Sequence, residues 1–67
     1  MKLFDTIKLK IDIPQENLRI GHLGTVVHLF ERDPKLYEVE FADDQGKTIT
    51  TITLNINEVE LFCESEN

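Results

Sequence analysis

Leucine and isoleucine, with Asp5 among them, recur at every second position from Leu3 to Ile13, and lysines stand between them. A period of two predicts a half-buried strand, here over about residues 4–11. Pro14 ends this strand because it has no N–H to donate to a ladder.

The connection after this strand predicts one short helical turn and a sharp change of direction. Pro14 fits the first turn of such a helix, with Leu18 turned inward. Gly21 and Gly24 follow, and they supply backbone angles that other residues adopt only at a cost in free energy.

Two further strands follow the glycines. Residues 25–30 carry apolar side chains on both faces, Val26 and Phe30 on one and Val27 and Leu29 on the other, which is typical of a central or strongly curved strand. A turn is expected over residues 31–35, around a proline.

Residues 36–42 predict the third strand, because apolar and acidic residues alternate along it. We expect Tyr37, Val39 and Phe41 to point inward and Glu38 and Glu40 to point outward.

The last third of the chain predicts a hairpin and a short final strand. Asp43 to Gly46 is the hairpin loop, with Gly46 in the left-handed region. The apolar phase of the following strand, residues 47–54, slips between Ile49 and Ile52, which suggests a bulge. We expect a single 3₁₀ turn over residues 55–57, a strand over residues 58–61 with Val59 and Leu61 inward, and a frayed tail over residues 62–67.

Five short strands, one long early loop and tight hairpins predict an all-β fold, a small SH3-like barrel that forms a single domain over residues 1–67. In that architecture the first and last strands are antiparallel neighbours, so Lys8 and Lys10 would lie beside Glu58 and Glu60. The expected core is formed by one residue or more from each of several strands: Ile7, Val26, Val39, Phe41 and Leu61.

Charge is distributed unevenly along the 67 residues, which carry a net charge of −6. Residues 1–35 sum to +1 and residues 36–67 to −7. The second half would therefore repel a nucleic-acid backbone and attract cationic surfaces. The alternative is that the charge serves solubility alone.

The sequence offers no catalytic constellation, cofactor motif or metal site, and we expect a protein that is not an enzyme. His22, His28 and Cys63 are too few to form a typical metal site. Asp43 and Asp44 lack the alternating acids of a calcium loop and are better explained as turn residues. Glu38 and Glu40 alternate with core residues, which places them on a convex surface rather than in a cleft.

The N-terminus lacks an apolar signal region, and no stretch approaches the length of a membrane span. The lone Cys63 fits a reducing compartment. We therefore expect a cytoplasmic protein without membrane contact.

The order and spacing of several short motifs resemble a small bacterial family, domain of unknown function 4926. The motifs are Phe4-Asp5-x-Ile7-x-Leu9, Asp12-Ile13-Pro14 with Leu18, Gly21-x-x-Gly24-x-Val26-Val27, Tyr37-x-Val39-Glu40-Phe41, Asp43-x-x-Gly46-x-Thr48 and Leu54 before Glu58-x-x-Leu61. The resemblance implies an SH3-like barrel and a stand-alone bacterial protein. It also implies a companion of proteins from neighbouring genes, including suspected toxins, and lends no catalytic residues.

Three functions are compatible with these observations. The first is a non-enzymatic protein-interaction module, an antitoxin- or inhibitor-like partner, that contacts a basic protein surface through Glu38, Glu40, Asp43 and Asp44. The second is a nucleic-acid-binding module that uses Lys8, Lys10, Arg19 and the loop from Gly21 to Gly24, against which the net charge counts. The third is an accessory barrel that forms a homodimer through exposed strand edges.

Overall fold

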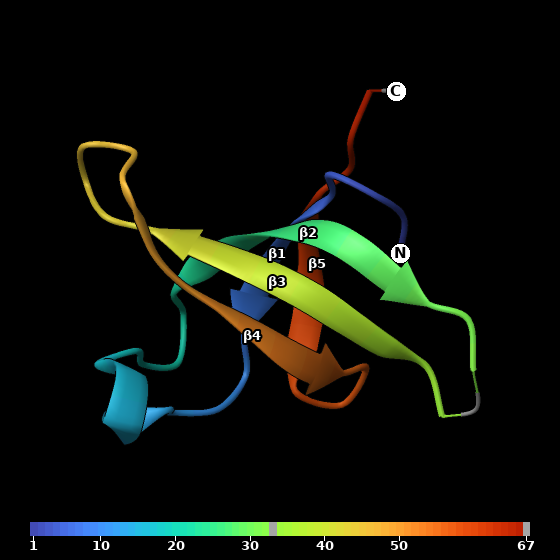
Figure 1. Cartoon of the computed structure of the whole chain (residues 1–67), viewed down its shortest axis with the longest axis horizontal. Coiled ribbons are helices and arrows are strands. Elements are labelled where there is room, and N and C mark those ends of the chain that lie inside the picture. The colour runs from blue at the N-terminus through green and yellow to red at the C-terminus, as the bar shows by residue number, and fades with distance from the viewer. Residues whose placement is uncertain (33, 67) are drawn as a thin grey trace.

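Five antiparallel strands form a single curved sheet in the computed structural model, which describes residues 1–32 and 34–66 (Figure 1). Their order across the sheet is β4-β3-β2-β1-β5. The elements, in chain order, are β1 (Thr6–Leu9), η1 (Pro14–Glu16), β2 (Leu23–Phe30), β3 (Leu36–Ala42), β4 (Thr48–Asn55) and β5 (Val59–Cys63). The predicted turn over residues 31–35 includes Asp33, and the predicted tail includes Asn67, both of which lie outside the described residues.

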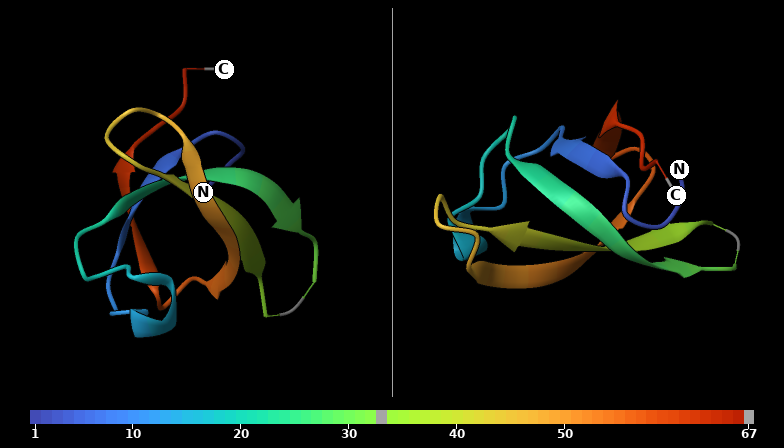
Figure 2. Two further views of the ribbon diagram at one scale, coloured as in Figure 1. Left: turned by 60° about the vertical axis from the view of Figure 1, so that its left-hand side comes forward. Right: turned by 90° about the horizontal axis from the view of Figure 1, so that it is seen from above.

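The all-β fold is confirmed, and the barrel is an approximate one because the sheet does not close. β1 pairs with β5 as expected, so the first and last strands are antiparallel neighbours. β4 and β5 are the two edges of the sheet, and Figure 2 shows how its curvature brings these edges round without joining them. None of the helices among the described residues has the length and apolar character needed to span a membrane.

The hydrophobic core lies on the concave side of the sheet. Four of the five residues expected at its centre, Ile7, Val26, Val39 and Phe41, are at most 1% exposed. The prediction for Leu61 is wrong, because its side chain is 44% exposed. It lies opposite Ile7, but β5 is an edge strand and no further strand covers it there. Val59, two residues earlier, fills the core instead.

A bulge changes which side chains of β2 face inward. The pairing of β2 with β3 shifts register between Val26 and His28, so Val27 has no partner opposite. As a result Val26 and Leu29 share the inner side, whereas His28 and Phe30 share the outer one. The rings of His28 and Phe30 meet edge to face, with their centroids 4.7 Å apart. The expectation that Val26 and Phe30 lie on the same face is therefore wrong.

The connection between β1 and β2 closes one end of the core. η1 is a 3₁₀ helix that starts at Pro14, as expected, and Asn17 ends it in the left-handed conformation. Ile13 and Leu18 form a short antiparallel bridge around it and are both buried. Strand β1 is shorter than the predicted 4–11 at both ends, because the chain turns at Phe4, whose φ is +68°, and bends at Lys10 and Ile11.

The C-terminal half confirms one expectation and corrects another. The expected bulge is confirmed at Ile49, which the register shift between Phe41 and Ala42 leaves without a partner on β3. β5 extends to Cys63, and the N–H of Ser65 donates to the Asp5 carboxylate at 2.7 Å. The expectation of a frayed tail from residue 62 onward is therefore wrong for these residues.

Candidate functional site

Glu38 and Glu40 lie side by side on the outer face of β3, as the alternation predicts. Each is paired across both neighbouring strands: Glu38 with His28 and Thr53, and Glu40 with Thr25 and Thr51. Both glutamates are half-buried between these neighbours. The two carboxylates therefore belong to a convex, threonine-rich surface in the middle of the sheet.

The carboxylate of Glu38 is directed toward the sheet edge. The hydroxyl of Thr53 on β4 donates a hydrogen bond to Glu38 Oε1 at 2.9 Å. Because β4 is an edge strand, this bond brings negative charge to within one strand of the open side of the sheet. Register alone places Thr53 opposite Glu38.

Asp43 and Asp44 lie in the β3–β4 loop and differ from each other in what their carboxylates do. Asp43 Oδ1 accepts hydrogen bonds from the N–H groups of Gln45 and Lys47, both at 2.9 Å. The backbone N–H of Asp43 also donates to Lys47 O at 2.8 Å. Asp43 thus closes the hairpin, and Gly46 at φ +81° completes the turn as expected. Asp44 is exposed and has no such role among the described residues.

Replacing Asp43 with alanine is expected to lower the free energy of unfolding by about 1–2 kcal/mol, because two backbone N–H groups of the loop lose their acceptor. Asp44→Ala removes the same charge one residue away and is expected to change stability by less than about 0.5 kcal/mol. Urea denaturation of both variants measures the difference. Equal losses would show that Asp43 contributes through its charge and not through the turn.

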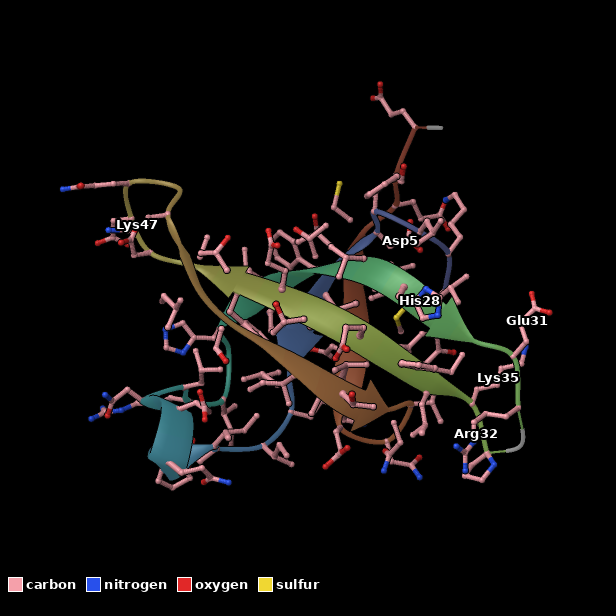
Figure 3. All side chains as sticks on the ribbon, in the orientation of Figure 1. Asp5, His28, Glu31, Arg32, Lys35 and Lys47 are labelled. Atoms are coloured by element: carbon pink, nitrogen blue, oxygen red, sulfur yellow. The ribbon has the colours of Figure 1, made fainter. Side chains whose placement is uncertain are left out.

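Basic side chains stand apart from this surface. Figure 3 shows Arg32 and Lys35 beside Glu31 in the β2–β3 loop and Lys47 at the opposite end of the sheet. Within the described residues the one ion pair joins Lys2 to Asp5, at 3.2 Å. The outer face of β3 is therefore acidic and carries no basic side chain on its own strand.

The residues considered for nucleic-acid binding have other neighbours in the structure. Lys8 lies opposite Glu60, and its ammonium sits 5.3 Å from the centre of the Phe62 ring. The backbone of Lys10 donates to Glu58 O, so both lysines adjoin β5 as predicted. Glu60 on β5 and Glu58 just before it offset part of the positive charge of these lysines. Gly21 and His22 lie beside the end of β1, whereas Gly24 already belongs to β2 and pairs with Ile7, so the expected loop from Gly21 to Gly24 is shorter than predicted.

Hollows on the surface do not gather the predicted acids. One of them, about 440 Å³, is lined by Asp12, Pro14, Asn17, Leu18 and Arg19. A second, about 320 Å³, lies at the β2–β3 loop beside Leu29 and Tyr37. Glu40 lines a shallow one of about 130 Å³ and is the single carboxylate in it. Glu38 lines none of these three hollows, so Glu38 and Glu40 do not share one of them.

Metal-ligand residues are also dispersed. Across residues 1–32 and 34–66, no three His, Cys, Asp or Glu side chains converge in a way that could hold a metal ion. His28 packs against Phe30, His22 Nδ1 accepts from the N–H of Arg19 at 2.8 Å, and Cys63 is exposed.

The strand β4 was predicted, but its position at the edge of the sheet was not. Its residues from Thr48 to Leu54 combine threonine and isoleucine without a single charge, and the strand forms an open edge next to the acidic face. The uncharged run is a visible signal, but only the strand order shows that it lies at an edge.

Comparison with known proteins places the chain in a family. A family model described as "Domain of unknown function (DUF4926)" matches residues 3–61, and these residues include β1 to β4 and the start of β5. No curated protein and no solved structure gave a match. The match covers nearly the whole chain, and this protein therefore belongs to the DUF4926 family.

Proposed function

We propose that this protein is a non-enzymatic interaction module that binds a protein with a basic surface through the outer face of β3 and the adjoining β4. The observation that carries the proposal is the placement of Glu38 and Glu40. They lie two residues apart on the outer face of β3, with Thr53 and Thr51 of β4 opposite them.

Half-buried carboxylates on a convex surface suit recognition of a partner better than catalysis. A catalytic pair needs a cleft that excludes water, whereas surface charges of one sign mainly speed association and set its dependence on salt. Asp44 extends the acidic region along the β3–β4 loop, and Asp43 contributes chiefly to the turn. The finer hypothesis of an antitoxin- or inhibitor-like role rests on the resemblance to companions of neighbouring-gene proteins.

The test is co-purification of the tagged chain from its host, followed by affinity measurement with the recovered partner. Glu38→Gln combined with Glu40→Gln is expected to weaken binding about tenfold at low salt, mostly through a slower association rate. The control, Glu64→Gln combined with Glu66→Gln, removes the same charge from the exposed tail and is expected to leave affinity within about twofold.

Two results would contradict the proposal. One is the recovery of no specific protein at low salt with the neighbouring genes intact. The other is equal weakening by the two double variants, because net charge alone would then explain the binding.

A further inference from the structure

We infer that β4 accepts an extended segment of the partner as an added strand, and that this segment alternates basic and apolar residues. The inference rests on the proposed function and specifies how and with what chemistry the partner binds. Strand addition satisfies the free backbone groups of an edge, while side chains on alternate positions supply specificity.

The backbone of β4 is open along its outer side. Its ladder with β3 runs from Thr48 to Asn55. In the described part of the chain, no backbone hydrogen bond joins residues 48–54 to any segment other than β3. Alternate N–H and C=O groups of an antiparallel edge strand point away from its neighbour, so a row of them is available here.

This edge lacks the devices that usually protect a free strand. Residues 48–54 contain no charge, proline or glycine, and six of the seven are threonine or isoleucine. Edge strands that stay solvated usually carry such residues, and lysine above all. The other edge of the sheet, β5, carries Glu60 next to its first residue. The bulge at the start of β4 leaves the stretch from Thr50 to Leu54 regular.

Charge next to the edge indicates basic residues on the outer side of the added strand. Neighbouring strands lie about 4.8 Å apart, so an added strand would be about 10 Å from β3. The hydrogen bond from Thr53 holds the Glu38 carboxylate toward β4. This shortens the distance between that carboxylate and a basic side chain on the added strand. A lysine or arginine that extends over Thr53 or Thr51 would meet Glu38 or Glu40.

The inward side chains of β4 indicate apolar residues at the alternate positions of the added strand. Ile52 lies opposite Val39 on the inner side and is only partly buried against the core. Leu54, two residues further on, lies opposite Tyr37 on the same side and is buried. Apolar side chains of the added segment would complete the burial of Ile52, with a gain of about 25 cal/mol per Å² of apolar surface covered.

A second copy of this chain fits the edge less well. Each copy has a net charge of −6. Pairing of β4 with itself would bring two acidic faces together with no basic residue on either strand. A basic segment from another protein relieves that repulsion instead of doubling it.

The experiment uses the full chain and an eight-residue capped peptide of strictly alternating lysine and valine, followed by amide exchange and chemical shifts in NMR spectra. We expect the peptide to bind at low salt and to slow exchange of amides within residues 50–54 by about tenfold. A block isomer of the peptide, four lysines followed by four valines, has the same charge without the alternation and is expected to give no such protection. Protection of β5 amides in place of β4, equal effects of both peptides, or dimerisation through β4 would overturn the inference.

Two matched variants locate the basic contact. Thr53→Val removes the hydroxyl that directs Glu38 and is expected to weaken the alternating peptide about threefold. Thr51→Val makes the same change on the same exposed face two residues away and is expected to leave binding unchanged. Thr51→Lys, which guards the edge with a charge, is expected to weaken binding more than tenfold.

These results separate the inference from the proposed function. If a host partner binds and depends on Glu38 and Glu40, yet Thr51→Lys leaves its affinity unchanged, then the interaction module stands and strand addition fails. If the peptide protects β4 but Glu38→Gln with Glu40→Gln does not weaken the host partner, then the edge accepts strands and the acidic recognition face fails.

Discussion

Gly24→Ala is expected to lower the free energy of unfolding by about 3 kcal/mol, because the added methyl group has no room. A Cβ at this position would lie 2.6 Å from Val39 Cγ1 and 2.8 Å from Phe41 Cε1. Both neighbours are central core residues with at most 1% exposure, so they have little freedom to move aside. For a domain of this size such a loss is a large part of the total stability.

Gly21→Ala is the matched control, because it isolates backbone strain from crowding. Gly21 has φ +95°, and no atom lies within 4 Å of the position that a Cβ would occupy there. This substitution is expected to cost about 1–2 kcal/mol through the left-handed conformation alone. Urea denaturation of both variants measures the difference between the two mechanisms.

A double-mutant cycle with Val39→Ala tests the cause of the Gly24 effect directly. Removing Cγ1 of Val39 relieves the shortest of the clashes, although the Phe41 ring still crowds the new methyl group, so the two substitutions together should cost about 1 kcal/mol less than the sum of each alone. Additive losses in the cycle, or a Gly24→Ala variant as stable as the parent chain, would show that the strands separate to accept the side chain.

The strands could be predicted because apolar and polar residues alternate with a period of two along a strand that buries one face. Tyr37, Val39 and Phe41 are buried for this reason, and Glu38 and Glu40 lie outside. The same logic failed at Val27, because one unpaired residue inverts the phase of everything after it. It failed again at Leu61, because this residue has the inward phase but lies on an edge strand, where no further strand buries it.

The candidate site was predictable only in part, for a related reason. Alternation identifies Glu38 as an outward acid, but the register between strands decides that Thr53 lies opposite and bonds to it. Strand order likewise decides that the uncharged run in β4 is an edge. Sequence-local patterns contain neither register nor order, since both depend on contacts between residues far apart in the chain.

The contacts of Asp5 could not be predicted from the sequence either, because they join the two ends of the chain. It lies just before β1, in the inward phase of the sequence alternation, and is 2% exposed. Its carboxylate accepts from the Lys2 N–H at 2.8 Å and from the Ser65 N–H at 2.7 Å, and it pairs with the Lys2 ammonium. Phe4 next to it has φ +68°, a strained angle for a bulky residue, which these bonds hold in place.

The hydrogen bonds of Asp5 make part of the stability depend on pH. The N–H groups of Ser65 and then Lys2 favour the charged carboxylate and hold its pKa below the ordinary 3.8, although burial acts in the opposite direction. The native state therefore binds fewer protons than the unfolded chain in this range. The stabilisation is present above about pH 4 and is lost as the pH falls through 3.8 toward the lower native pKa.

Asp5→Asn is accordingly expected to lower the melting temperature at neutral pH by about 5–10 °C, since the amide cannot satisfy both N–H donors and leaves Lys2 without its partner. The difference from the parent chain should shrink as the pH falls from about 5 to about 2, because the parent loses the same interaction by protonation. Thermal denaturation of both proteins between about pH 2 and pH 7 measures this difference in melting temperature.

Asp44→Asn is the control, because it removes an exposed carboxylate that holds no part of the fold together; its difference from the parent should stay near zero at every pH. Deletion of residues 64–67 takes away the Ser65 N–H while leaving Asp5 and should destabilise in the same direction as Asp5→Asn. If the Asp5→Asn difference is constant with pH, the carboxylate acts through shape alone. If the deletion has no effect, the contact to Lys2 suffices, and the C-terminal segment is not part of what stabilises the strained turn at Phe4.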